Sequence, residues 1–141
     1  RSVIWSFVIA ISFETVHVFA WLKARTAVQP HERVIPRFAL IVLAPPSFTR
    51  TRANIPDALR GYKEIHLRAL KLLKPGGTLA TFCCSHHVDA ATFQQVILEA
   101  AFDARRVLRR VQTLSQSPDH PILPSIPETE YLKGFAFEIA R

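Results

Sequence analysis

Apolar and polar positions follow two different periods along this chain. Apolar runs of strand length occupy residues 3–13, 38–43 and 78–84, and the run at 38–43 is continuous, which is typical of a strand buried on both faces of a parallel sheet. Between the second and third runs, apolar side chains recur at helical spacing and form one stripe. The pattern therefore predicts a helix over residues 56–73 that connects two parallel strands.

Capping and turn residues predict where these elements begin and end. Pro56 suits the first turn of the helix, and residues 74–77 (Lys-Pro-Gly-Gly) predict its end and a tight turn. Asp89 is a candidate N-cap for a further helix, and four prolines within residues 115–129 predict a loop. The other expected elements are a helix over residues 15–28 and strands over 106–113 and 134–140. Strands that alternate with helices indicate an α/β domain with a largely parallel sheet.

Two short motifs directly follow the strands at 38–43 and 78–84. They are Leu43-Ala44-Pro45-Pro46-Ser47-Phe48 and Thr81-Phe82-Cys83-Cys84-Ser85-His86. Because one helix-length segment separates the two strands, parallel pairing brings both motifs to the same edge of the sheet. Ligands bind at this edge in open α/β sheets, so the sequence predicts a site there.

Composition and charge fit a single folded domain with a polyanionic partner. The chain has 141 residues, 49% of them hydrophobic, which is enough for one core and too little for two. Its 18 Lys and Arg against 11 Asp and Glu give a net charge of +7, which suits binding to a polyanion. The apolar run at 3–13 is too short to span a bilayer, so we expect no membrane-spanning segment.

The two cysteines, Cys83 and Cys84, are adjacent in the sequence. Neighbouring residues on a strand point to opposite faces, so a disulfide framework is excluded and a reducing compartment, the cytoplasm, is expected. The chain begins at Arg1, which suggests a fragment or a processed chain.

An ordered set of motifs between residues 38 and 141 carries a family resemblance. The set consists of Pro45-Pro46-Ser47-Phe48, Tyr62-Lys63-Glu64-Ile65, Leu72-Leu73-Lys74-Pro75-Gly76-Gly77, Cys84-Ser85-His86-His87, Pro118-Asp119-His120-Pro121 and Glu128-Thr129-Glu130-Tyr131-Leu132-Lys133-Gly134. With these motifs, the chain resembles the C-terminal half of the class I S-adenosylmethionine-dependent methyltransferases. More closely, it is similar to the bacterial large-subunit ribosomal RNA methyltransferases that form 5-methylcytosine.

The resemblance implies a fold and a cofactor. The fold is a Rossmann-like three-layer α/β sandwich, with a mostly parallel sheet, an antiparallel last strand and a truncated N-terminal part. Residues 1–141 would form a single, partial catalytic domain, in which residues 1–37 match the family poorly. The implied cofactor is S-adenosylmethionine, with Ala20, Ala44 and Pro45 at cofactor-binding positions. Ala44 stands where the family has aspartate, Ala20 aligns with an acidic residue near the adenine, and the glycine-rich loop has no counterpart.

Cys84 aligns with the cysteine of the family's Cys-Ser-His motif, which makes it the implied catalytic nucleophile. Carbon-5 of cytosine is a poor nucleophile, so its methylation requires prior covalent attack on carbon-6, and a thiolate suits this attack. The residues alone favour a simpler interpretation, in which both cysteines are small buried side chains at a strand end. The resemblance favours the nucleophile for Cys84 and leaves the buried role to Cys83.

The resemblance also implies a substrate-binding surface around Cys84. Pro45, Pro46 and Phe48 would form a rigid, apolar wall on which an extruded base stacks, and a strand terminator followed by a turn is the alternative. The two arginines that follow it could contact RNA phosphates or stack on bases. The substrate-binding residues expected on this basis are Pro45, Pro46, Ser47, Phe48, Arg50, Arg52 and His86.

Three further clusters leave alternatives open. The cysteines and histidines at 83–87 lack the paired spacing of tetrahedral zinc ligands, so we expect no metal site. Asp119 and His120 either line the site or brace the proline-rich loop. A second basic group contacts RNA or forms a solvated edge; it consists of Arg105, Arg106, Arg109 and Arg110.

Three functions are compatible with these residues. The first is RNA cytosine methylation through a Cys84 adduct, and the second is methylation of an exocyclic amine, which uses a Pro-Pro-aromatic wall without a cysteine. The third is a catalytically silent methyltransferase fold that binds RNA or a protein partner. The expected partner is ribosomal RNA. A truncated sheet would also leave an exposed edge, which residues 3–13 or a homodimer would cover.

Overall fold

Helices and strands alternate in the computed structural model, which describes residues 18–27, 38–48 and 52–140. The elements are α1 (Val18–Thr26), β1 (Phe38–Leu43), the 3-10 helix η1 (Arg52–Asn54), α2 (Ile55–Leu72), β2 (Leu73–Cys83), α3 (Ala90–Asp103), β3 (Leu108–Leu114), the 3-10 helix η2 (Pro127–Thr129) and β4 (Lys133–Ile139). This order confirms the expected α/β class. The strand expected over residues 3–13 lies outside the described residues.

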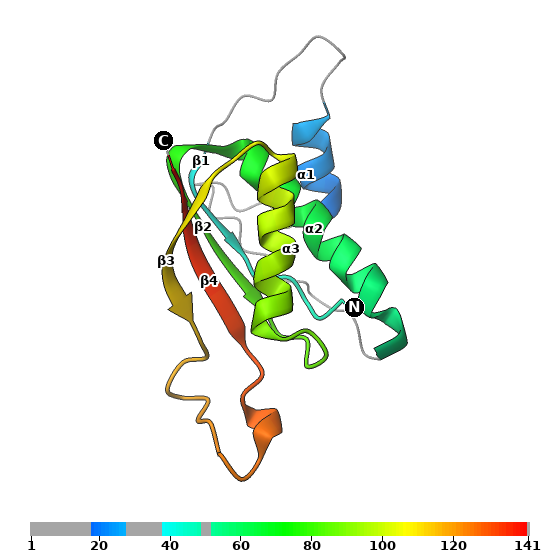
Figure 1. The fold of residues 1–141 in the computed structure, drawn as a ribbon, viewed down its shortest axis with the longest axis vertical. Helices are drawn as coiled ribbons and strands as arrows, with labels where there is room; N and C mark the ends of the chain where they lie inside the picture. The colour runs from blue at the N-terminus through cyan, green and yellow to red at the C-terminus, as the bar shows by residue number, and fades with distance from the viewer. Residues whose placement is uncertain (1–17, 28–37, 49–51, 141) are drawn as a thin grey trace.

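The described strands form one mixed sheet with the order β1-β2-β4-β3 (Figure 1). β1 and β2 pair in parallel, whereas β4 runs antiparallel to both of its neighbours, β2 and β3. β1, β2 and β3 therefore share one direction, and the last strand opposes them from its place between β2 and β3. The expected antiparallel last strand is confirmed.

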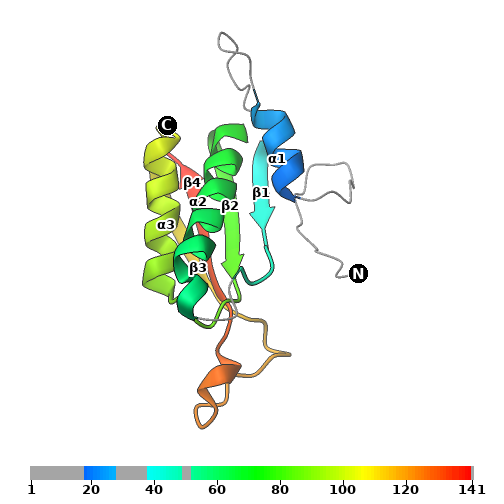
Figure 2. The ribbon, with the colours of Figure 1, turned by 90° about the vertical axis from the view of Figure 1, so that its right-hand side faces the viewer.

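The three α-helices lie side by side on one face of this sheet, with α2 between α1 and α3 (Figure 2). The strands match this arrangement, because Ile41, Leu79 and Phe137 are buried in the core while the alternate residues Leu40 and Ala80 are partly exposed. Within the described ranges, no helix covers the second face. The described part of the chain thus supplies two layers of the expected three-layer sandwich.

The start of each of the two longer helices agrees with its prediction. Pro56 lies in the first turn of α2. Asp89 caps α3, because its side chain accepts a hydrogen bond from the backbone N–H of Thr92 at 2.6 Å, and this bond lowers the pKa of the Asp89 carboxyl. α3 therefore begins a few residues beyond the motif that follows β2.

The Lys-Pro-Gly-Gly segment differs from its prediction as a tight turn. α2 ends immediately before β2 begins at Leu73, with no separate turn between them. Leu73 pairs with Phe38, but the regular register with β1 resumes only near Thr78, so residues 74–77 lie in a register shift. Gly76 adopts a φ of 73° there, which glycine tolerates. Leu73 is buried and is already part of the sheet, so residues 74–77 form an irregular part of β2.

The strand expected to start at residue 106 begins at Leu108 instead. Ala104 closes α3, and Arg105 then takes a left-handed φ of 54°. The backbone N–H of Arg106 returns to the carbonyl of Ala101 at 2.9 Å. Arg106 therefore belongs to the end of α3 and not to the strand that the sequence pattern predicted there.

A buried histidine joins α2 to β2. The Nε2 atom of His66 lies 2.8 Å from Oγ1 of Thr81, and its Nδ1 lies 2.6 Å from the carbonyl oxygen of Tyr62. Because a carbonyl only accepts, Nδ1 carries the proton and Nε2 accepts from the threonine hydroxyl. Burial lowers the pKa of His66 to about 4, so the ring is neutral near pH 7.

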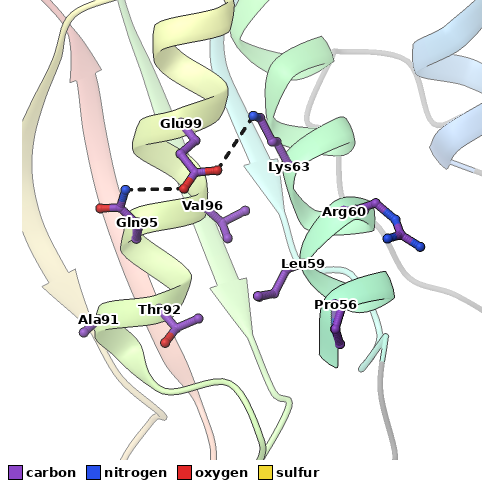
Figure 3. A pocket seen from close by; sticks show the side chains of 9 residues that line it. All are labelled: Pro56, Leu59, Arg60, Lys63, Ala91, Thr92, Gln95, Val96 and Glu99. Atoms are coloured by element: carbon purple, nitrogen blue, oxygen red, sulfur yellow. Dashed lines mark hydrogen bonds and ion pairs between the residues drawn. The ribbon is translucent and has the colours of Figure 1, made fainter. Parts of the chain in front are cut away.

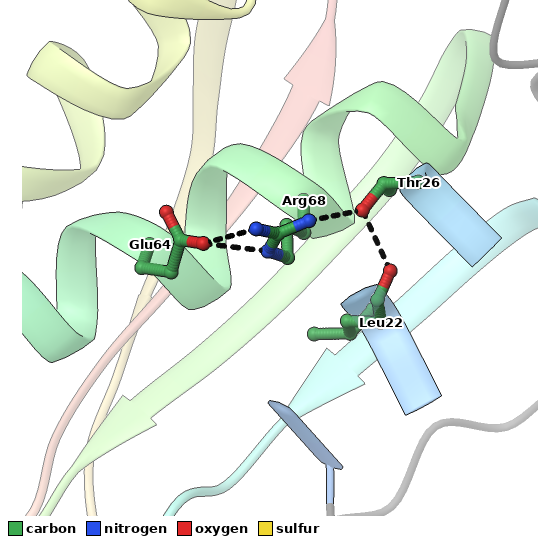
Figure 4. Close-up of polar contacts among 4 residues, drawn as sticks. All are labelled: Leu22, Thr26, Glu64 and Arg68. Atoms are coloured by element: carbon green, nitrogen blue, oxygen red, sulfur yellow. Dashed lines mark hydrogen bonds and ion pairs between the residues drawn. The ribbon is translucent and has the colours of Figure 1, made fainter. Parts of the chain in front are cut away.

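Arg68 links α1 to α2, as Figure 4 shows. Its guanidinium forms an ion pair with Glu64 on the same helix and donates a hydrogen bond of 2.5 Å to Oγ1 of Thr26. The Thr26 hydroxyl donates in turn to the carbonyl of Leu22 at 2.7 Å. An isolated helix of nine residues is marginal in water, so these contacts and the burial of Leu22 hold α1 against α2.

Candidate functional site

The ends of β1 and β2 lie next to each other at one edge of the sheet, the carboxyl edge, which Leu43 and Cys83 define. Leu43 pairs with Thr81 on β2. Beyond the strands, the Oγ atom of Ser47 lies 2.9 Å from the Oγ atom of Ser85. The structure thus brings together the two motifs that the sequence placed at one edge.

Ser85 is the centre of a hydroxyl network beneath the carboxyl edge. It is fully buried, and its Oγ lies 2.9 Å from both the Ser47 Oγ and the Tyr62 hydroxyl. The thiol of Cys83 donates a hydrogen bond of 3.3 Å to the same Tyr62 oxygen. Burial, followed by the bond from Cys83, raises the pKa of Tyr62, so the phenol stays protonated at neutral pH. The network ties the ends of β1 and β2 to helix α2.

The two cysteines occupy different environments. Cys83 is fully buried, in keeping with the structural role expected for it, whereas Cys84 is half-buried at the carboxyl edge. Burial and the neighbouring Cys83 raise the pKa of the Cys84 thiol, while the ammonium of Lys133 and the backbone of Ser47 lower it. The net result is a raised pKa for the thiol of Cys84, the less buried of the two cysteines, in spite of the nearby ammonium of Lys133.

Lys133 reaches the carboxyl edge from β4. It pairs with Cys83 at the end of β2, and its side chain is half-buried. Its Nζ donates a hydrogen bond of 2.7 Å to the carbonyl of Ser85. The first residue of β4 therefore contacts the backbone immediately after Cys84.

The residues expected to form the base-stacking wall differ in exposure. Pro45 is buried, and Phe48 is half-buried with its ring centroid 4.5 Å from that of Tyr62. Pro46 and Ser47 are exposed. The solvent-facing part of the wall is thus the Pro46–Ser47 segment, while Phe48 packs against α2.

The other substrate-binding candidates flank this wall or lie outside it. His86 is exposed in the turn that follows Cys84 and Ser85. Arg52 is the first residue of η1. Arg50 lies outside the described residues.

The cofactor-binding candidates offer apolar surface. Ala20 is exposed on α1, Ala44 is half-buried directly after β1, and Pro45 is buried beside it. Methyl and pyrrolidine groups suit contact with an adenine ring, and they have no side-chain atom that accepts a hydrogen bond from a ribose hydroxyl. Contact between these three residues and S-adenosylmethionine stays a prediction.

The proline-rich loop between β3 and β4 projects beyond the carboxyl edge (Figure 1). Within it, Nε2 of Gln116 donates to the carbonyls of His120 and Thr129 at 2.8 and 2.7 Å. The hydroxyl of Ser117 binds Asp119 and lowers the pKa of its carboxyl. The His120 ring packs edge-on against Tyr131, with centroids 6.5 Å apart. Asp119 and His120 thus make contacts that brace the loop.

The second basic group lies away from the carboxyl edge. Arg105 and Arg106 follow the far end of α3, and Arg106 donates to the carbonyl of Leu73 at 3.3 Å. On β3, Arg109 pairs with Glu138 at 2.6 Å, and Arg110 donates to Gln94 at 2.7 Å. These arginines therefore contact neighbouring elements of the fold.

A groove of about 530 Å³ runs between the first halves of α2 and α3 (Figure 3). Its lining residues are Pro56, Leu59, Arg60, Lys63, Ala91, Thr92, Gln95, Val96 and Glu99. Lys63 lies 3.0 Å from Asp103 and 3.7 Å from Glu99, and these carboxylates raise its pKa. Its charge is thus balanced within the helix layer.

The described residues contain no group of three or more histidine, cysteine, aspartate or glutamate side chains arranged to hold a metal ion. They also contain no helix whose length and apolar content would let it cross a bilayer.

Curated relatives match most of this chain. Ribosomal RNA large subunit methyltransferase I of Vibrio parahaemolyticus is 44% identical over 103 residues, which make up 73% of this chain and 26% of that protein. The protein of the same name from Pseudoalteromonas atlantica is 41% identical over 113 residues, 80% of this chain and 29% of the relative. The chain is homologous to large-subunit ribosomal RNA methyltransferases. No family model matches the sequence.

The fold of this chain is similar to that of two solved structures named as methyltransferases. A solved structure named as a methyltransferase complexed with SAH has a TM-score of 0.63 at 19% identity and covers 87% of this chain and 30% of its own. A SAM-dependent methyltransferase structure from Streptococcus mutans also has a TM-score of 0.63, at 16% identity over 87% of this chain and 29% of its own. These matches confirm the Rossmann-like α/β methyltransferase fold.

Three residues that shape this edge were missed by reasoning from the sequence: Tyr62, Ser85 and Lys133. Each lies inside one of the stretches that carry the resemblance to ribosomal RNA methyltransferases, which was the available signal. Tyr62 sits on the apolar stripe of α2, and Lys133 follows the proline-rich loop. Their convergence depends on the pairing of β2 with β4 and on the packing of α2, which residue patterns do not encode.

Proposed function

We propose that this chain is part of an RNA methyltransferase that forms 5-methylcytosine in ribosomal RNA, with Cys84 as the nucleophile. The supporting observation is the position of Cys84, half-buried at the carboxyl edge beside Ser47, in a chain homologous to ribosomal RNA methyltransferases. Because the chain spans 26% of that relative, residues beyond those described complete the proposed enzyme. The cytosine carbon as target rests on the Cys-Ser-His motif.

The proposed chemistry needs a sulfur nucleophile at this edge. The Cys84 thiolate attacks carbon-6 of cytosine, an S–C6 bond forms, and the C5=C6 electron pair moves to carbon-5. S-adenosylmethionine, when bound, would supply the methyl group to carbon-5 and would leave as S-adenosylhomocysteine. Loss of the carbon-5 proton to water then restores the C5=C6 bond and expels the thiolate. The cycle as a whole regenerates Cys84.

The surrounding residues bind and orient the substrate in this proposal. Pro46 is the exposed part of the wall on which the extruded base stacks, and Ser47 and His86, from the turn after Cys84, contact the base. Arg50 and Arg52 contact the RNA backbone. Ala20 and Pro45 contact the cofactor, and Ala44 lies where the cofactor and the target base meet.

The partner and compartment follow from the same proposal. The net charge of +7 supports binding to ribosomal RNA, and a reduced Cys84 is consistent with the cytoplasm. A homodimer across the edge of β1 stays a prediction.

Covalent trapping tests the proposal. The whole protein that contains this chain is incubated with S-adenosylmethionine and a ribosomal RNA fragment that carries 5-fluorocytosine, because the fluorine blocks release of the enzyme from carbon-6. We expect a denaturant-resistant adduct with the wild type and with Cys83→Ala, and no adduct with Cys84→Ala. An adduct that survives in Cys84→Ala would exclude Cys84 as the nucleophile.

A second candidate function is a catalytically silent fold that binds RNA. The alanines at positions 20 and 44 favour it, because neither supplies an acid to the cofactor or the base. Calorimetry with S-adenosylmethionine separates the two candidates: micromolar affinity supports the enzyme, whereas millimolar or no affinity supports the silent fold. Methylation of an exocyclic amine is recognised by methyl transfer that persists in Cys84→Ala.

A further inference from the structure

Lys133 and Ser85 connect two elements that are far apart in the sequence. Lys133 begins β4 and pairs with Cys83, the last residue of β2. Its ammonium crosses the end of β2 and donates a hydrogen bond of 2.7 Å to the carbonyl of Ser85. A half-buried lysine is thereby fixed beside the backbone that carries Cys84.

The groups that surround Cys84 differ in charge. Cys83 and Tyr62 are buried next to each other, and the Cys83 thiol donates a hydrogen bond to the Tyr62 oxygen. Asp89 is exposed and bound to the first turn of α3, and the ammonium of Lys133 contributes to the lowered pKa of its carboxyl. The charged and titratable groups on the described elements next to Cys84 are Cys83 on β2, Tyr62 on α2, Lys133 on β4, Asp89 at the start of α3, and His86 and His87 in the intervening turn. Among these described groups, the ammonium of Lys133 is the cation that acts to lower the pKa of the Cys84 thiol.

We propose that Lys133 is a positioning residue for Cys84, which holds the backbone of the Cys84–Ser85 segment and places a positive charge beside the sulfur. The inference rests on the proposed function, in which Cys84 reacts as a thiolate and a positive charge beside its sulfur favours that form. A nearby cation stabilises a thiolate relative to a thiol and opposes the effect of burial. The distance of 2.7 Å to the Ser85 carbonyl keeps the cation at this place.

The carboxyl edge is also held by contacts that do not involve Lys133. The hydroxyl of Ser85 is held independently by Ser47 and Tyr62, each at 2.9 Å. Removal of the lysine charge therefore leaves two anchors on Ser85 in place. Neutral variants of Lys133 are expected to fold and to differ from the wild type mainly in the reactivity of Cys84.

The test measures alkylation of Cys84 by iodoacetamide as a function of pH in the intact chain, with the modified cysteine located by mass spectrometry. Lys133→Gln keeps a hydrogen-bond donor without the charge, Lys133→Met removes both, and Lys133→Arg keeps both. Lys74→Met is the matched control, because Lys74 is exposed in β2. The buried Cys83 serves as an internal reference that reacts only if the fold opens.

We expect the pH midpoint of Cys84 alkylation to rise by about one pH unit in Lys133→Gln and Lys133→Met, which corresponds to about a tenfold slower reaction at pH 7.5. Lys133→Arg and Lys74→Met should retain the wild-type midpoint. If Lys133→Met does not fold, Lys133→Gln still carries the comparison. Unchanged midpoints in folded neutral variants, or an equal rise in Lys133→Arg, would overturn the inference.

The outcome is distinguishable from failure of the proposed function. A raised midpoint in the neutral variants, together with no adduct on 5-fluorocytosine RNA in the wild type, would refute the proposed enzyme and keep the role of Lys133. A wild-type adduct together with unchanged alkylation midpoints would keep the enzyme and refute that role.

Discussion

The hydroxyl oxygens of Ser47 and Ser85 lie 2.9 Å apart, although 38 residues separate them in the sequence. Ser47 follows β1 and Ser85 follows β2, so this contact joins the two motifs at the carboxyl edge. Ser85 makes a second contact of 2.9 Å to Tyr62 on α2. One buried hydroxyl therefore fixes two strand ends and a helix relative to one another.

Substitution of Ser85 by alanine should destabilise the fold. It removes two hydrogen bonds and leaves the buried hydroxyl of Tyr62 with one partner fewer, so the free energy of unfolding should fall by about 1–3 kcal/mol. Ser125→Ala, at an exposed loop position, should change it by less than about 0.5 kcal/mol. Urea unfolding of both variants measures the difference. Equal stability of the two variants would contradict a structural role of the Ser85 network.

Substitution of Ala44 by aspartate should increase activity if the proposed function holds. Ala44 is half-buried directly after β1, at the position where the methyltransferase family that this chain resembles has aspartate. An acid there would hold the base while charge develops on its ring, and we expect roughly a 100-fold faster formation of the covalent adduct. Ala39→Asp, at an exposed position on the same strand, is the matched control. Equal rates in the two variants would argue against a substrate contact at position 44.

Protonation of His66 should destabilise the protein in acid. Burial lowers its folded pKa to about 4, below the ordinary value of 6.5, so the unfolded chain takes up this proton first. The stabilising contribution of the neutral ring is complete above about pH 6.5 and is lost as the pH falls toward 4, by about 3 kcal/mol in all.

The comparison variant for this effect is His66→Gln, which does not titrate. The difference in unfolding free energy between the wild type and His66→Gln should shrink as the pH falls from 6.5 to 4. The control variant His87→Gln, at an exposed position in the turn, keeps His66 and should lose stability in acid as the wild type does. Parallel pH profiles for the wild type and His66→Gln would show that His66 does not titrate in this range.

Substitution of Arg68 by alanine should loosen α1. The side chain bridges Glu64 and Thr26, so its loss should lower the free energy of unfolding by about 1 kcal/mol and speed proteolysis within α1. Arg60→Ala removes an ion pair with Asp57 on the same helix, but both side chains are more than 70% exposed. That control should cost less than about 0.5 kcal/mol. Equally faster cleavage of α1 in Arg68→Ala and Arg60→Ala would contradict a specific role of Arg68 in holding α1.

Several elements could be predicted because their signals are local. The continuous apolar run of β1, the apolar stripe of α2 and the N-cap at Asp89 depend on neighbouring residues, and each prediction agrees with the structure to within a few residues. The start of β3 and the irregularity at residues 74–77 could not be predicted in the same way. They depend on how a helix ends and on when a strand meets its partner.

The sequence by itself determined the α/β class, the family resemblance and the placement of two motifs at one edge of a parallel strand pair. Only the tertiary structure decided which side chains meet there. Tyr62, Ser85 and Lys133 converge around Cys84 because α2 packs on β2 and β4 inserts beside it. The hydrogen bonds and charges at this edge join residues far apart in the chain, so they arise from packing and strand pairing, whereas periodicity and capping act between near neighbours.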